Sequence, residues 1–139
     1  INSFYGNIVN KKDSTGATSD AGERGFIIRE ISSQPHYLEV SAGGKKDSAI
    51  QWIKCNRDIR DDVEDGDNQH IAFTASVGGT VKIYHNGELC GQGNAGTYGF
   101  NSAKVLDIGN TVYNGMLDDI RIYRGELTNQ EIMTVLNGG

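Results

Sequence analysis

The sequence predicts an all-β domain, an antiparallel β-sandwich closed by one short helix at its C-terminal end. Several stretches alternate between apolar and polar residues with a period of two, which is typical of strands that bury one face. The pair Asn86-Gly87 stands between two such stretches and favours a tight hairpin turn. The 139 residues include 19 glycines but only 1 proline, a composition that suits many short strands joined by turns. We expect residues 1–139 to form a single domain.

The first half contains strand-like stretches separated by turn-forming Gly, Ser and Asp residues. They are residues 4–9, 25–31, 37–40 and 49–55. In the last of them Ile50 and Trp52 share one face, whereas Gln51 lies on the other. We therefore expect Trp52 to pack in the core.

The second half begins with a predicted strand over residues 69–76. Its inward side chains would be Ile71, Phe73 and Ala75. His70 and Thr74 fall on the outward face of this strand. We interpret His70, and likewise His85 on the following strand, as a surface residue rather than a metal ligand.

Residues 80–90 predict a β-hairpin, because Asn86 and Gly87 tolerate the positive φ angles of a type I′ turn. A two-residue turn also fixes the register of the two arms. The expected pairs are His85 with Glu88, Tyr84 with Leu89, and Ile83 with Cys90.

Residues 104–108 and 116–123 predict the last strands, and a helix follows them. The apolar stripe of this helix consists of Ile132, Val135 and Leu136. Thr128 and Glu131 have the spacing of a capping box, and the terminal glycines end the helix. Because no helical pattern separates the strands, an antiparallel sandwich is favoured over alternating strands and helices.

The charge distribution argues against nucleic-acid binding, because phosphate contacts need clustered basic residues and the net charge here is −5. No apolar run reaches the ~20 residues that cross a bilayer. Residues 57–67 are dense in charge, which invites comparison with the calcium-binding loop of an EF-hand. With Gly66 at the sixth position of that loop, Val63 and Ala72 stand at the third and twelfth positions, where oxygen ligands are needed. We expect a solvated acidic loop there.

Cys55 and Cys90 are the only cysteines of the chain, and they lack the spacing of a metal site. They form either two separate thiols or one disulfide bridge. A bridge would imply an oxidising compartment.

Several motifs of the second half occur in a fixed order. They are residues 70–74 (HIAFT), 79–89 (GTVKIYHNGEL), 106–109 (LDIG), 113–123 (YNGMLDDIRIY) and 127–132 (LTNQEI). In this order the chain resembles the laminin-G-like jelly-roll domains of the concanavalin A-like lectin and glucanase superfamily. The resemblance implies a concanavalin A-like sandwich that is extracellular, at the surface of a cell or a virion.

The opening of the chain departs from this family, because residues 8–11 (IVNK) resemble its second or third strand rather than its first. The resemblance implies a first strand beside the last one, so its loss would leave a strand edge and core side chains exposed. We expect a strand from a partner chain or a removed upstream segment to cover this edge by β-addition, or residues 4–9 to take its place. Homo-oligomerisation through the same edge is a further expectation.

Catalysis is not expected, because a retaining glycosidase needs two carboxylates close together on one strand face. Residues 64–67 (EDGD) lie in a glycine-broken loop, and Asp118 and Asp119 point to opposite faces of a predicted strand. The resemblance implies a structural calcium ion near Asp118 and Asp119, since carboxylate oxygens suit that ion. An ion pair between Asp119 and Arg121 explains Asp119 equally well.

A glycan site is predicted where aromatic faces that stack on sugars accompany amide side chains that bind hydroxyls. Residues 91–101 and 110–114 form loops that carry both kinds of side chain. The candidate contacts are Asn94, Tyr98, Asn110, Tyr113 and Asn114. Alternatively, Tyr98 and Phe100 close the end of the core. The sequence thus predicts a carbohydrate-binding or adhesion module, with a structural assembly domain that docks neighbours through its sheet edges as the alternative.

Overall fold

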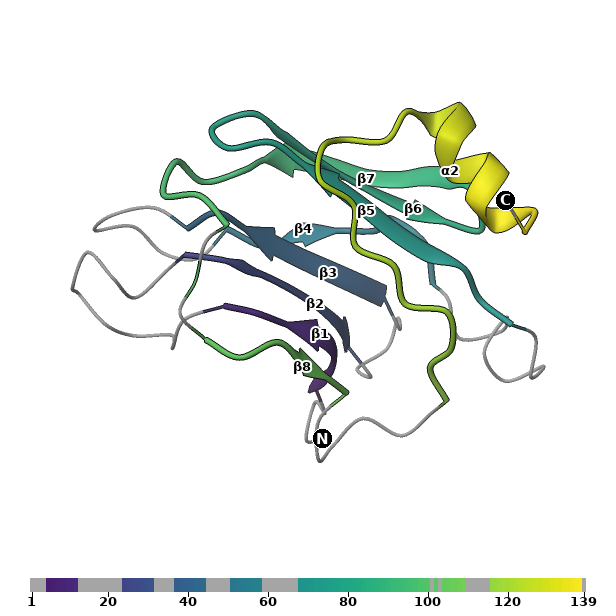
Figure 1. Ribbon diagram of the computed structural model, residues 1–139, viewed down its shortest axis with the longest axis horizontal. Coiled ribbons are helices and arrows are strands. Elements are labelled where there is room, and N and C mark those ends of the chain that lie inside the picture. Colours follow the sequence, from purple (N-terminus) through teal and green to yellow (C-terminus); the bar gives the residue numbers. More distant parts are fainter. Residues whose placement is uncertain are drawn as a thin grey trace.

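In the computed structural model the chain folds into two antiparallel sheets that face each other, with a helix near the C-terminus (Figure 1). The structure describes residues 5–12, 24–31, 37–44, 51–58, 68–100, 102, 104–109 and 116–138. This architecture confirms the predicted antiparallel β-sandwich. Among these residues no helix is both long and apolar enough to span a membrane.

The larger sheet has the strand order β4-β3-β2-β1-β8. Its strands are β1 (Tyr5–Asn10), β2 (Phe26–Ile31), β3 (Tyr37–Ala42), β4 (Ile53–Lys54) and β8 (Asp107–Ile108). The first four are neighbours in sequence and in space, as expected for antiparallel strands joined by turns. β8 comes from the second half of the chain and pairs with β1, where Val9 lies opposite Ile108. β1 therefore lies between β2 and β8 and does not pair with residues 116–123.

The smaller sheet has the strand order β5-β6-β7. Its strands are β5 (Ile71–Ala75), β6 (Thr80–His85) and β7 (Glu88–Asn94). Asn86 and Gly87 reverse the chain between β6 and β7 with φ angles of 50° and 81°, which confirms the predicted hairpin turn. β5 is an edge strand, because no described strand pairs with its other side.

The hairpin register is as predicted next to the turn, where His85 pairs with Glu88 and Tyr84 with Leu89. The third expected pair is wrong, because Ile83 lies opposite Gly91 and a bulge interrupts the ladder after it. The extra residue is Cys90, which leaves the ladder and forms a disulfide with Cys55. The bulge thus takes Cys90 out of the ladder, where it forms the disulfide that links the two sheets.

The core lies between the sheets and consists mainly of aliphatic side chains. Its fully buried members, each 0% exposed, are Leu38, Val40, Val81 and Ile83. They come from β3 and β6, where Leu38 and Val40 lie two residues apart on one strand and Val81 and Ile83 on the other. Phe26 and Phe73 meet across the sandwich with ring centroids 5.6 Å apart. Ile71, Phe73 and Ala75 all pack against this core, as expected.

The prediction that Trp52 packs in the core is wrong. Ile53 and Cys55 are the buried residues of this stretch, at 7% and 2% exposure. Trp52 therefore faces away from the core, and the Arg29 guanidinium lies 3.5 Å from its ring centroid. Two contacts determine which alternate side chains of this stretch face the core. Cys55 must reach Cys90, and Ile53 packs against Gly93.

One edge of the sandwich is closed where β4 meets β7. The Cys55–Cys90 disulfide joins the two strands there, and the Asn56 amide donates to the Cys90 carbonyl over 2.6 Å. Gly91 permits this approach, because a Cβ atom at its position would lie 2.1 Å from the Lys54 carbonyl oxygen.

The interpretation of His85 as a surface residue is also wrong, because its side chain is 0% exposed. Its Nε2 atom lies 2.7 Å from the Gln69 amide oxygen, and Arg57 lies 3.4 Å from Nδ1. These two polar neighbours satisfy the ring in the interior.

Residues 116–123 do not form the predicted strand, although their apolar pattern is intact. Asp119 has a φ angle of 49°, which interrupts the extended backbone. The segment instead crosses the opening between the two sheets as an irregular stretch before it reaches the helix (Figure 1).

Helix α2 (Asn129–Leu136) confirms the prediction for the C-terminal end. Thr128 and Glu131 form the expected capping box, and Ile132 is buried at 1% exposure. Met133 and Leu136 lie close to Gly87, so the helix packs over the turn of the β6–β7 hairpin.

Candidate functional site

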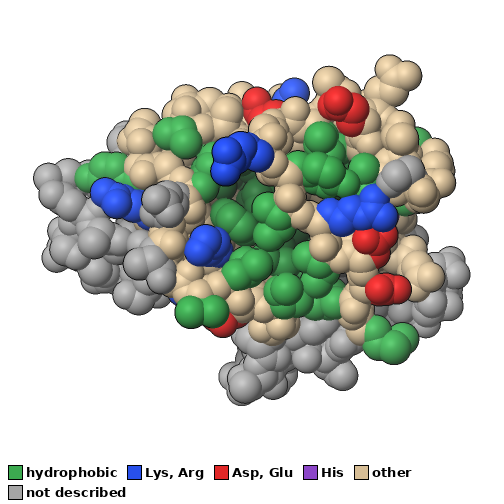
Figure 2. Space-filling model, viewed as in Figure 1, with side chains coloured by type: hydrophobic (Ala, Val, Ile, Leu, Met, Phe, Trp, Pro, Cys, Tyr) green, Lys and Arg blue, Asp and Glu red, His purple; other side chains and the backbone are tan. Residues whose placement is uncertain are grey.

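A groove of about 810 Å³ opens between the two sheets on the side away from the closed edge. We call it the open groove. Its floor comes from the inner faces of β1 and β2, and its walls from β5, residues 116–127 and the start of α2. Most of the side chains that line it are apolar, and Figure 2 shows such side chains gathered in the middle of this face, flanked by basic ones.

The floor of the open groove is continuous with the core. Ile8 and Ile28 are core residues, and Phe26 packs against that core. Phe73 brings the β5 wall into contact with Phe26 across the sandwich. The core is therefore accessible from this side, where a closed sandwich would bury it under another strand.

The second wall exposes an unusual amount of apolar surface. Its exposed side chains are Met116 (97%), Leu117 (36%), Ile120 (42%), Ile122 (62%) and Tyr123 (46%). Single exposed apolar residues are common on proteins, but a contiguous set beside a groove is typical of an interaction surface.

The polar residues of the open groove are few and partly paired. Arg121 donates from Nε and Nη2 to the two carboxylate oxygens of Asp119, over 2.7 and 2.8 Å. These hydrogen bonds hold the pKa of Asp119 below its usual value. Burial lowers the pKa of His70, and the nearby carboxylate of Asp119 opposes part of that shift. The Nδ1 atom of His70 is buried and has no hydrogen-bond partner among the residues that the structure describes.

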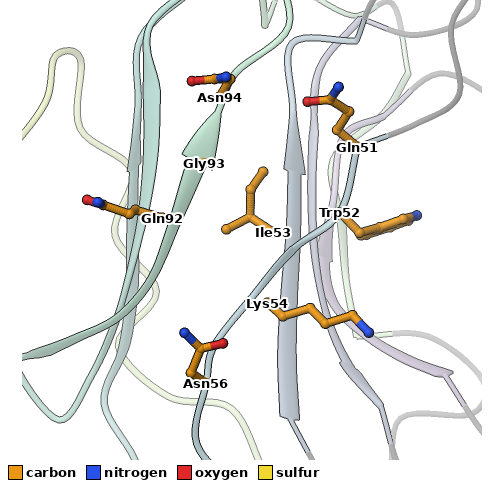
Figure 3. Close-up of a pocket in the computed structure, with 8 residues that line it drawn as sticks. All are labelled: Gln51, Trp52, Ile53, Lys54, Asn56, Gln92, Gly93 and Asn94. Carbon is orange, nitrogen blue, oxygen red and sulfur yellow. The ribbon is translucent and has the colours of Figure 1, made fainter.

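A second, polar groove of about 530 Å³ follows the closed edge. Its polar lining consists of Gln51, Lys54, Asn56, Gln92 and Asn94, together with Trp52. Figure 3 shows that Trp52 and Lys54 point to one side of this edge, whereas Gln92 points to the other. The side chains do not converge on one point, so the groove lacks a shared ligand position among the residues described.

The structure places the predicted glycan contacts in different surroundings. Asn94 is exposed at the end of β7 and lines the polar groove. Residues 91–94 are therefore strand and not loop, a correction to the prediction. Tyr98 does not line that groove, and its amide donates to the Gly43 carbonyl over 3.0 Å. Phe100 packs against the core, as the alternative interpretation expected.

The other three predicted contacts, Asn110, Tyr113 and Asn114, lie outside the described residues. The described residues therefore do not test whether the two predicted loops lie together. Their role as a glycan site stays a prediction.

Asp118 and Asp119, the predicted calcium ligands, lie on the second wall of the open groove. Both carboxylate oxygens of Asp119 are engaged by Arg121, and one oxygen of Asp118 accepts from the Asp119 amide over 2.8 Å. No group of three or more His, Cys, Asp or Glu side chains suited to a metal occurs in the described part of the chain. A calcium ion at Asp119 would have to displace the guanidinium.

The open groove itself was only partly anticipated. The sequence predicted an uncovered strand edge, but it placed residues 116–123 in a strand. The signal that marks the groove is the apolar content of that segment, which includes Met116, Ile120 and Ile122. Sequence alone does not show whether such residues are buried.

The two antiparallel sheets and the short helix of the described residues define a concanavalin A-like β-sandwich. Comparison with protein families supports this class, because a family model of the laminin G type, described as the concanavalin A-like lectin/glucanases superfamily, matches residues 4–133. The chain belongs to this superfamily. Curated proteins and solved structures gave no match.

Proposed function

We propose that this domain is a non-catalytic adhesion or assembly module that binds a polypeptide partner in the open groove. The observation that carries the proposal is the exposed apolar wall of residues 116–123 beside an accessible core. An apolar surface of this kind is costly in water unless a partner covers it.

A partner that covers this wall would gain a moderate free energy of binding. Met116, Ile120 and Ile122 are 97%, 42% and 62% exposed. Burying what remains of them would contribute roughly 4 kcal/mol, at about 2 kcal/mol for each side chain taken fully from water. Since micromolar binding needs about 8 kcal/mol net, the partner must also use the groove floor or backbone hydrogen bonds.

The test is selection of peptides from a random phage-displayed library on the immobilised domain. Selected peptides should compete with one another for one site and lose most of their binding to an Ile120→Asp variant. Leu89→Asp is the matched control, since Leu89 is 49% exposed but does not line the groove. Selected peptides that bind Ile120→Asp and Leu89→Asp equally well would refute the proposal.

The proposal includes a location outside the cell. The Cys55–Cys90 disulfide supports this, because such bridges persist mainly in oxidising compartments. Recovery of the protein from its source with both thiols free to alkylation would contradict it.

A second candidate function is glycan binding at the polar groove. It is supported by the lining of that groove, which combines the amide side chains of Gln51 and Asn94 with the half-buried Trp52. A glycan array should then give signals that Asn94→Ala and Trp52→Ala reduce. A blank array at high protein concentration removes this candidate.

The calcium prediction has its own test. Calcium held by Asp118 and Asp119 should raise the melting temperature, and EDTA should reverse the rise. An Asp119→Asn variant should lose the effect. Equal melting temperatures in calcium and in EDTA would exclude the site.

A further inference from the structure

Within the part of the chain that the structure describes, the outer edge of β5 pairs with no strand, and it borders the open groove. The Asn86 amide donates to the His70 carbonyl over 2.8 Å, which makes this pair a hydrogen-bonded one in the β5–β6 ladder. Because hydrogen-bonded pairs alternate along an antiparallel ladder, Ala72 and Thr74 also direct their backbone groups at β6. Ile71, Phe73 and Ala75 then direct their N–H and C=O groups away from β6, toward the groove.

The opposite wall of the groove is not part of a sheet ladder. Residues 116–124 belong to no strand. Local hydrogen bonds to side chains occur there, such as the Asp119 amide donating to Asp118 Oδ1. The groove thus lies between the edge of β5 and a segment that forms no described strand.

We propose that the open groove accepts one extended strand of another polypeptide, which pairs antiparallel with β5 and so continues the ladder β7-β6-β5. This inference rests on the proposed function and names its partner. Only a polypeptide offers donors and acceptors that recur every second residue, about 6.7 Å apart, as the β5 edge requires. A lipid or a sugar would leave those groups unpaired, and a buried backbone group without a hydrogen bond is destabilising.

The position of the groove also determines the side chains of the strand. Its inward side chains would meet Ile8, Phe26 and Ile28 on the floor, so they are apolar. Its outward side chains face the other way and can be polar. The partner is therefore a segment with apolar residues at alternate positions.

A free segment fits this site better than a second folded copy of the domain. The edge strand of a folded copy carries its own sheet beside it, and residues 116–127 occupy the space on that side of the groove. A strand with two free edges can pair with β5 and still face the second wall.

The test uses a synthetic nine-residue peptide that alternates valine and threonine, with lysine at both ends for solubility. Amide hydrogen exchange of the domain is followed by NMR with and without the peptide. The amides of Ile71, Phe73 and Ala75 should exchange at least tenfold more slowly when the peptide is bound, and the amides of Ala72 and Thr74, already bonded to β6, should change little.

Two backbone-methylated peptides are the matched controls. In an antiparallel pair, residues bonded to each other place their side chains on the same face, so the inward valines carry the backbone groups that meet β5. Methylation of the valine nitrogens should weaken binding at least tenfold, whereas methylation of the threonine nitrogens should be tolerated. Equal binding of the two methylated peptides, or loss confined to the threonine-methylated one, would overturn the inference.

Different experimental results would refute the inference and the proposed function. Phage-selected peptides that need Ile120 but leave the β5 amides unprotected would preserve the groove as the docking site and refute strand addition. If exchange of these amides in the domain alone slows as its concentration rises, a second copy occupies the edge and the inference is wrong.

Discussion

Removal of the Cys55–Cys90 disulfide should destabilise the domain by about 4 kcal/mol. The bridge closes a loop of 35 residues, and the loop-entropy relation gives this value at 25 °C. Its position adds to its importance, because it joins β4 of one sheet to β7 of the other at the closed edge. Since single domains are stable by only about 5–15 kcal/mol, the loss would be a large part of the total.

The assay is urea unfolding of the Cys55→Ala/Cys90→Ala variant beside the oxidised protein, followed by circular dichroism. With a slope of about 1–3 kcal/mol per molar urea, the midpoint should fall by roughly 1 M or more. The wild-type protein reduced with a thiol is the control, because it lacks the cross-link but keeps both side chains. A loss below about 1 kcal/mol in both samples would refute the reasoning.

The remaining predictions concern the helix cap, a close contact at Gly96 and the half-buried His70. Thr128→Ala should cost about 1 kcal/mol in thermal unfolding and raise the pKa of Glu131 toward its usual value by NMR titration, because the backbone and hydroxyl of Thr128 hydrogen-bond that carboxylate. An unchanged Glu131 pKa would contradict this. Gly96→Ala should cost about 1–3 kcal/mol, since its Cβ would lie 1.8 Å from the Gly44 carbonyl oxygen, whereas Gly125→Ala meets nothing within 4 Å and bears only the strain of its φ angle of 106°. A urea midpoint of Gly96→Ala equal to that of the unmutated protein would exclude the contact. The lowered pKa of His70 means that the unfolded chain takes up its proton first as the pH falls, so this part of the stability is present above about pH 6.5 and is lost below it. His70→Gln should flatten the stability profile in that window, and an unchanged profile would show that another group titrates there.

The presence of the strands could be predicted from the sequence, because it depends on local patterns of apolar and polar residues. β2, β3 and β5 lie where strands were predicted, and the Asn86-Gly87 turn follows from backbone preferences alone. The capping box of Thr128 and Glu131 is equally local. Such features need no knowledge of distant contacts.

The errors arose where distant contacts decide the outcome. Alternation in residues 49–55 fits two frames, and the choice that buries Ile53 instead of Trp52 depends on contacts with β7. The bulge at Cys90 likewise follows from its disulfide to Cys55, which the spacing left open. A strand over residues 116–123 would have to pair with a sheet edge, but no described strand pairs with this segment, and Asp119 within it has a φ angle of 49°.

The same contrast between local features and distant contacts applies to the candidate site. The sequence identified Asn94, which does line a polar groove, but Tyr98 uses its backbone to bind the loop at Gly43. The open groove arises from elements far apart in sequence, including Phe26, Phe73 and Ile120. Only their placement in three dimensions shows that they share one surface.

Amide hydrogen exchange of the free domain, without any added peptide, tests most directly whether the β5 edge is open. The amides of Ala72 and Thr74 should be protected by their bonds to β6, and those of Ile71, Phe73 and Ala75 should exchange much faster. Uniform protection of all five amides would mean that the edge is already paired, and the groove would then not be a docking site.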